Sequence, residues 1–117
     1  MSLAPYVRIL GRGPGRSRSL TQEEAQEAMA LMLRGAVAPE AIGALVMLMR
    51  MKGETPEEIA GFARAAGATL PPLPRPDLDW PSYAAGRTRG LPWFLLSARL
   101  VARAGHRVLM HGYNGAD

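Results

Sequence analysis

The sequence predicts an α/β protein with an all-α N-terminal part: a helical bundle followed by the first βαβ unit of an incomplete parallel-sheet domain. Signals that start and stop helices recur through residues 20–67, which we predict to be a helical domain. Residues 68–77 are rich in proline, which breaks helices, and are predicted to be a hinge. Residues 78–117 then read as strand, helix and strand, the order of a βαβ unit.

Residues 1–19 are predicted to form a short basic helix and a loop. Leu3 to Leu10 can place apolar side chains on one side of a helix, and residues 11–19 are dominated by glycine, proline and serine. We interpret the loop arginines as a solvated tail in preference to a flexible basic arm. The segment carries no acid, and its arginines are Arg8, Arg12, Arg16 and Arg18.

The first two helices of the helical domain are bounded by clear signals. Thr21 and Glu24 have the spacing of a capping box, in which each side chain accepts a hydrogen bond from the backbone amide of the other residue. Gly35 is suited to end that helix. Pro39 is suited to open the next helix, which is predicted to end at Gly53.

The segment VMLMRMKGETPEEIAGF, residues 46–62, is interpreted as a corner between two helices and not as a reaction site. Thr55 and Glu58 repeat the capping-box spacing, and the helix that they open is predicted to run to about Gly67. Carboxylates are favourable at the positive end of a helix, and methionine fills irregular cores. The expected buried positions of the three helices are Ala25, Ala28, Met29, Met32, Leu33, Ile42, Leu45, Val46, Leu48, Met49, Ile59, Phe62, Ala63 and Ala66.

Residues 78–117 are predicted to begin an α/β domain. A strand starts at Leu78, a helix opens at Pro92, and a buried strand follows over residues 106–110. Two strands and one helix cannot cover both faces of a parallel sheet. We therefore expect a fragment, a truncated reading frame, or missing strands supplied by another chain. Trp93 and Phe94 are predicted to pack into the core; for Trp80 and Tyr83 both packing and stacking on bases stay open.

Composition excludes several function classes. The chain has no cysteine, so it has no disulfide and no thiolate metal site, which fits a reducing cytoplasm. Its longest apolar run is far too short to span a membrane, and its N-terminus does not read as a signal peptide. His111 has no second histidine or acid at ligand spacing, so we predict no metal site and no cofactor. We expect a cytoplasmic protein without membrane contact.

The stretches LTQEEAQEAMALMLRG and APEAIGALVMLMRMKGETPEEIAGFARA, followed by the proline hinge and the βαβ order, resemble the anthranilate phosphoribosyltransferase family, glycosyl transferase family 3. The resemblance implies that residues 20–67 are a helical dimerisation domain. It also implies a homodimer, or pairing with a longer paralogue. Family enzymes bind phosphoribosyl diphosphate and Mg²⁺ on the α/β domain.

The motifs of these enzymes are degenerate in this chain. The family's Gly-Thr-Gly-Gly-Asp loop follows the first strand, and residues 80–90 lack its glycine pair and its aspartate. After the second strand the family has Lys-His-Gly-Asn-Arg, of which His111 and Gly112 match while Met110 replaces the lysine. The family's metal-binding acids lie beyond Asp117. The positions of the degenerate phosphoribosyl diphosphate site are Ser82, Gly86, Gly90, His111 and Gly112.

The stretch PSYAAGRTRGLPWFLLSARLVARAGHRVLMHG, residues 81–112, is similar to a divergent branch of the family, the YbiB-like proteins. That resemblance implies binding of nucleic acid without sequence preference. The alternative interpretation is a solvated helix face with ordinary loop arginines, partly neutralised by Asp77 and Asp79. The candidate residues for nucleic-acid or phosphate binding are Arg87, Arg89, Arg99, Arg103, Arg107 and Tyr83.

Taken together, the sequence predicts the N-terminal part of an anthranilate phosphoribosyltransferase-like protein that dimerises through its helices. We predict no catalysis by this chain, no catalytic residue, and sequence-independent binding of nucleic acid. The alternative is a phosphoribosyltransferase that uses phosphoribosyl diphosphate and Mg²⁺. A third interpretation assigns the helices only a structural role, in pairing with the longer paralogue.

Overall fold

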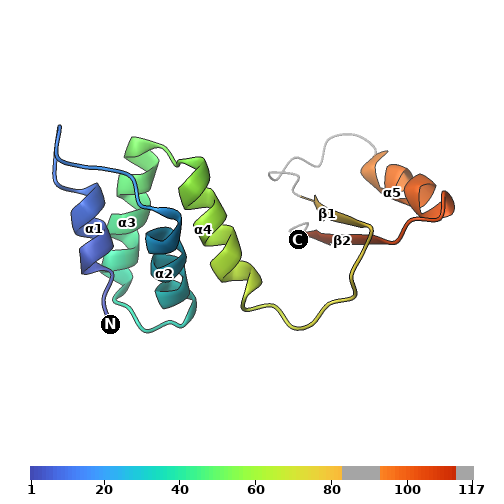
Figure 1. Cartoon of the computed structure of the whole chain (residues 1–117), viewed down its shortest axis with the longest axis horizontal. Helices are drawn as coiled ribbons and strands as arrows, with labels where there is room; N and C mark the ends of the chain where they lie inside the picture. The colour runs from blue at the N-terminus through green and yellow to red at the C-terminus, as the bar shows by residue number, and fades with distance from the viewer. Residues whose placement is uncertain (83–92, 113–117) are drawn as a thin grey trace. The chain divides into compact units, whose positions relative to one another are not determined.

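The computed structural model describes residues 1–82 and 93–112, and it divides into two compact units, Met1–Pro71 and Pro72–Asp117. The first unit is helical, and the described part of the second contains one helix and two paired strands (Figure 1). The predicted fold class is confirmed. The elements in chain order are α1 (Ala4–Leu10), α2 (Gln22–Leu33), α3 (Pro39–Lys52), α4 (Pro56–Gly67), β1 (Leu78–Ser82), α5 (Trp93–Arg103) and β2 (Val108–Gly112).

Both predicted capping boxes are confirmed. At the start of α2, the Thr21 hydroxyl accepts from the Glu24 amide at 3.2 Å, and the Glu24 carboxylate accepts from the Thr21 amide at 2.9 Å. At the start of α4, Thr55 and Glu58 exchange the same two hydrogen bonds at 3.3 and 2.8 Å. Each box satisfies two amides that a helix start leaves without a partner, so local sequence fixes both starts.

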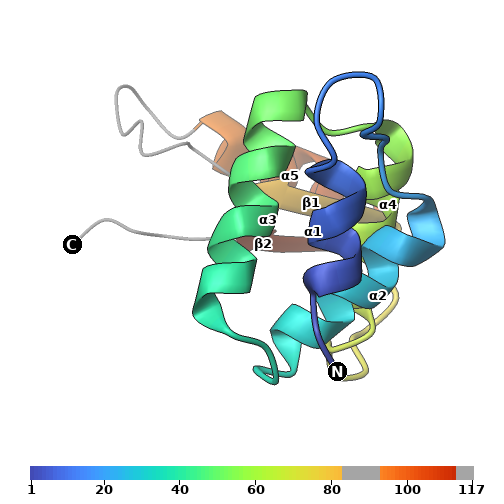
Figure 2. The ribbon, with the colours of Figure 1, turned by 90° about the vertical axis from the view of Figure 1, so that its left-hand side faces the viewer.

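The helices of the first unit pack in pairs, α1 on α3 and α2 on α4 (Figure 2). Their core forms two clusters of buried side chains. One gathers around Leu45 and Met49 of α3, and the other around Leu3 and Leu31. The clusters contain Leu10, Leu20, Ala25, Leu45 and Met49 in the first, and Leu3, Ala28 and Leu31 in the second.

The buried face of α4 was predicted only in part: Phe62 packs against the core and Ala66 is half-buried, but the other two predicted positions are exposed. Ile59 is 56% exposed and Ala63 is exposed, while Gly61 and Ala65 are buried. Gly61 lies so close to α2 that an added Cβ would stand 2.8 Å from the Cβ of Ala25. The small residues of α4 therefore decide which face is buried, because they let the two backbones approach.

Two further core positions were misplaced. Leu33 is 46% exposed and Leu31 is buried in its place, because Leu31 follows Ala28 by three residues and shares its face. Val46 is 57% exposed, since the buried face of α3 is formed by Leu45 and Met49. The helix is apolar on all sides, so periodicity alone did not identify that face.

The second unit contains a parallel strand pair in which Leu78 is opposite Val108 and Ser82 is opposite Gly112. Helix α5 contacts β2. The prediction that Trp93 packs into a core is wrong for the described structure, because its side chain is 64% exposed. Phe94 is likewise 39% exposed. A buried strand was expected over residues 106–110, but His106 and Arg107 are exposed and precede β2, and Val108–Met110 are only half-buried. Two strands of five residues offer too narrow a surface to cover one helix.

Within residues 1–82 and 93–112, no helix combines the length and the apolar character that a bilayer-spanning segment needs. The cellular compartment stays a prediction.

Candidate functional site

The most distinctive surface of the first unit is an exposed apolar strip on α3, which we call the α3 strip. It lies on the side of the helix away from the buried residue Leu45, is flanked by the exposed charged residues Glu40 and Arg50, and consists of Gly43, Ala44, Met47 and Met51. Met47 is 62% exposed and Met51 is 79% exposed. The methionines were expected to be adaptable core, which the structure bears out for Met49 and not for Met47 or Met51.

Gly43 has no role in the packing of the described unit. A Cβ added there would meet nothing within 4 Å, and the residue is exposed in the middle of α3. A glycine inside a helix costs roughly 0.5–1 kcal/mol relative to alanine. The internal structure of the unit therefore gives no reason for this glycine.

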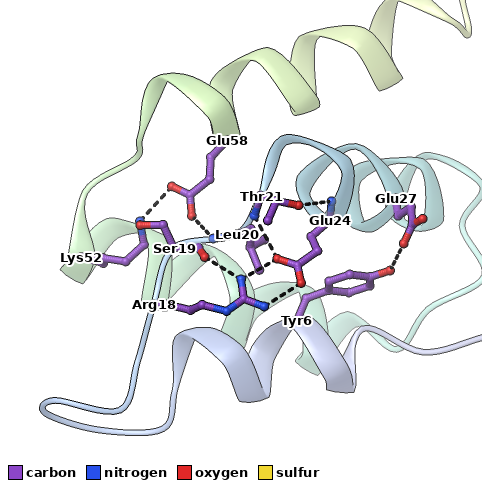
Figure 3. A network of polar contacts seen from close by, with 9 residues as sticks. All are labelled: Tyr6, Arg18, Ser19, Leu20, Thr21, Glu24, Glu27, Lys52 and Glu58. Carbon is purple, nitrogen blue, oxygen red and sulfur yellow. Dashed lines mark hydrogen bonds and ion pairs between the residues drawn. The ribbon is translucent and has the colours of Figure 1, made fainter.

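Arg18 is held in the structure and is not part of a solvated tail, which corrects that expectation. Its guanidinium binds the Glu24 carboxylate through two hydrogen bonds of 2.7 Å (Figure 3). The hydrogen bond from Arg18 lowers the pKa of Glu24 to about 2. Arg12 and Arg16 are exposed. The loop arginines thus divide into one that clamps the start of α2 and two that face solvent.

Glu58 joins three parts of the first unit, as Figure 3 shows. Its buried carboxylate accepts from the amide of Leu20 at 2.8 Å, from the amide of Thr55 at 2.8 Å and from Lys52 Nζ at 2.8 Å. Burial alone would raise the pKa of Glu58, but these hydrogen bonds outweigh it and lower the pKa. The corner between α3 and α4 is thus a structural junction, as its sequence predicted; the bond to Leu20 was not anticipated.

In the second unit, the predicted residues at the strand ends lie together. Ser82 and Gly112 face each other in register, so closely that a Cβ on Gly112 would stand 2.9 Å from the Ser82 carbonyl carbon. His111 Nε2 lies 2.8 Å from Asp79 Oδ1, so the histidine has an acidic partner across the sheet. Both side chains of that pair are more than half exposed. Carboxyl ends of parallel strands are where α/β folds bind ligands.

The predicted arginine surface is only partly described. Arg99 and Arg103 are exposed and four residues apart on α5, so they share one face. Arg107 is paired with Asp77 through its backbone amide at 2.8 Å and its guanidinium at 3.1 Å, and hydrogen bonding from the Arg107 side chain lowers the pKa of Asp77 to about 2. Trp80 is half-buried in β1. The remaining candidates, Tyr83, Gly86, Arg87, Arg89 and Gly90, lie outside the described residues.

Comparison with known proteins identifies the family to which this helical bundle belongs. Residues 4–68 match the helical bundle domain of a glycosyl transferase family, and the chain belongs to that family. It is 37% identical over 98 residues to the anthranilate phosphoribosyltransferase of Vibrio parahaemolyticus, covering 81% of this chain and 30% of the relative.

Two further relatives give the same result. The anthranilate phosphoribosyltransferase of Serratia proteamaculans is 36% identical over 100 residues, which is 83% of this chain and 30% of that protein. That of Vibrio cholerae is 36% identical over 103 residues, which is 86% of this chain and 31% of that protein. The chain therefore resembles the N-terminal part of these transferases and spans about three tenths of their length.

Proposed function

We propose that the helical unit of this anthranilate phosphoribosyltransferase-like chain is a homodimerisation module that pairs through the α3 strip. The observation that carries the proposal is the exposure of Met47 and Met51 on the side of α3 opposite the core. Fully burying one methionine or valine side chain contributes roughly 1.5–3 kcal/mol. Val46, which is 57% exposed beside the strip, adds to the surface that a partner would cover.

Gly43 provides a place where a second helix could approach α3 closely. Small residues let two helices approach closely, and Gly43 and Ala44 offer such a place beside the long side chains of Met47 and Met51. In an antiparallel twofold pairing centred on Met47, Met51 of each copy would face Gly43 of the other, because both lie four residues from Met47. A glycine without an internal role thus becomes useful as a contact for a second copy.

Sedimentation equilibrium of the full chain tests this proposal. We expect a dimer, and we expect Met47→Glu to dissociate it, because the substitution buries a carboxylate without a partner. Ile59→Glu is the matched control, since Ile59 is 56% exposed on α4 and lies away from the strip. Equal effects of the two substitutions would contradict the assignment to α3. A chain that is monomeric alone and binds only a longer relative would favour the alternative partner, a longer paralogue.

We also propose that this chain is not catalytic. In support, residues 80–90 lack the glycine pair and aspartate of the transferase loop, and Met110 stands in place of the lysine. Among the residues that the structure describes, no three His, Asp or Glu side chains converge to hold a metal ion, so they do not fit Mg²⁺. Titration calorimetry with phosphoribosyl diphosphate and Mg²⁺ should give no binding heat. Saturable heat would favour the transferase alternative.

A second proposed function is sequence-independent nucleic-acid binding by α5. The observation that favours it is the shared face of Arg99 and Arg103, both exposed. Affinity for single-stranded DNA should fall steeply with salt, since arginine–phosphate contacts release counterions. The double substitution of Arg99 and Arg103 by alanine should weaken binding, whereas Arg107→Ala should weaken it less because Asp77 already pairs with Arg107. No binding at low salt would remove this function.

A further inference from the structure

Met47 and Met51 are the residues of the α3 strip that can undergo redox chemistry. The sequence has seven methionines and no cysteine, so methionine supplies all of its sulfur. Met47 is 62% exposed and Met51 is 79% exposed, whereas Met49 between them is 5% exposed. A dissolved oxidant can therefore reach two sulfurs on one side of α3 and is excluded from the one on the other side.

We propose that Met47 and Met51 form an oxidative modification site at which peroxide controls the pairing of α3. This inference rests on the proposed dimerisation through the α3 strip. The oxidant is a hydroperoxide, such as hydrogen peroxide. Reactivity in this class follows exposure, so the dissociated chain is the form that is modified.

The chemistry balances without any further reactant. The thioether sulfur donates a lone pair to one peroxide oxygen, the sulfur–oxygen bond forms and the oxygen–oxygen bond breaks. The sulfur is oxidised by two electrons, and hydrogen peroxide is reduced to one molecule of water after proton transfer, or an organic hydroperoxide to one molecule of its alcohol. The product, methionine sulfoxide, is reversible by methionine sulfoxide reductases, so the modification can regulate as well as damage.

The consequence for pairing follows from the polarity of the product. A sulfoxide oxygen is a strong hydrogen-bond acceptor, and burying such a group without a partner is unfavourable. The side chains of Gly43, Ala44, Met47 and Met51 carry no hydrogen-bond donor, and the exposed Arg50 beside them would have to give up its own hydration to serve as one inside the dimer. Oxidation therefore stabilises the separated chains, whose sulfoxides stay hydrated, relative to the dimer.

The experiment compares the full chain before and after treatment with hydrogen peroxide. Peptide mass spectrometry locates the added oxygen, and sedimentation velocity measures the dimer dissociation constant. We expect sulfoxide at Met47 and Met51, an unmodified Met49, unchanged circular dichroism, and a dissociation constant raised about tenfold or more. Oxidation of Met47 and Met51 should also slow as protein concentration rises, because the dimer covers them.

Two variants make the outcome specific. The double substitution Met47→Leu and Met51→Leu conserves volume, so it should dimerise and lose the response to peroxide. Met110→Leu changes a methionine of β2 and should keep the full response. A dimer that persists with both sulfoxides in place overturns the inference while leaving the proposed function intact. An untreated chain that is monomeric at every concentration overturns the proposed function itself.

Discussion

The two units of this chain bury their apolar side chains to very different degrees. Among the described residues, every buried apolar residue except Ala98 belongs to the helical unit. In the strand unit, α5 exposes a row of large apolar side chains and the strands are at most half-buried. The large apolar residues exposed on α5 are Trp93, Phe94, Leu95, Leu96 and Leu100.

The same comparison holds for polar groups. In the helical unit a buried carboxylate has three donors, one of them 38 residues away in sequence. In the strand unit the Asp77–Arg107 ion pair and the contact between Asp79 and His111 lie at the surface. The difference indicates that the helices form a complete core, whereas the strand pair has the apolar surface of a sheet that other elements normally cover.

The largest effect should come from truncating a core leucine. Leu45 is 1% exposed, so Leu45→Ala should destabilise the helical unit by about 2–5 kcal/mol. Leu96→Ala removes the same atoms from a side chain that is 50% exposed and should change stability by less than about 0.5 kcal/mol. Urea unfolding followed by circular dichroism measures both. A Leu96→Ala effect as large as that of Leu45→Ala would mean that the strand unit also has a dense core.

A second pair of substitutions tests where the helical unit is tightly packed. Gly61→Ala places a methyl group against the α2 backbone, which cannot move cheaply, and should cost about 1–3 kcal/mol. Gly43→Ala enters open space and should stabilise the isolated helical unit by about 0.5–1 kcal/mol through helix propensity. Thermal unfolding at low protein concentration, where the chain is monomeric, measures the change in stability for each of the two variants.

Gly43→Ala also connects stability to pairing. Because the added methyl group would stand between the helices of the proposed dimer, the same variant should raise the dimer dissociation constant. Stabilisation of the monomer together with tighter dimerisation would contradict the close approach at Gly43.

The third largest change in stability is expected at the buried carboxylate of Glu58. Glu58→Gln keeps the shape of the side chain and removes the charge that Lys52 faces at 2.8 Å, so we expect a loss of about 1–2 kcal/mol. Glu57→Gln, at the exposed neighbouring position, is the control and should have little effect. Urea midpoints that coincide for the two variants would show that the network is not a source of stability.

Sequence predicted the helix starts of the first unit because their determinants are local. Thr21 and Glu24 are three residues apart, and so are Thr55 and Glu58, so each capping box can be identified without tertiary structure. The family of the chain could also be predicted, because the helical segments that resemble the family are continuous in sequence.

Features that depend on tertiary contacts could not be predicted from the sequence. On α4, Ile59 was predicted to be buried and Gly61 was not, because isoleucine is more hydrophobic, but close approach of the two backbones favours the residue without a side chain. The bond from Leu20 to Glu58 joins residues 38 positions apart and has no local signal. The α3 strip was missed because Met47 and Met49 are the same residue type on opposite sides of one helix.

The smallest expected effect concerns two carboxylates that arginines hold at a pKa of about 2, Glu24 in the helical unit and Asp77 in the strand unit. Because Glu24 has a lower pKa folded than unfolded, its contribution is present at neutral pH. That contribution is lost as the pH falls from about 4.5, its ordinary pKa, to about 2. Since Arg18 is half exposed, solvent screening should reduce the contribution to roughly 1 kcal/mol.

Unfolding of the helical unit as a function of pH tests this comparison. Glu24→Gln should lower stability at pH 7 and flatten its decline below pH 4.5, because the group that takes up the proton is gone. Asp77→Asn should leave the curve of the helical unit unchanged, since Asp77 lies in the other unit. An acid response of the helical unit that followed Asp77 instead of Glu24 would mean that the two units are energetically coupled, and that the helices are not a complete core by themselves.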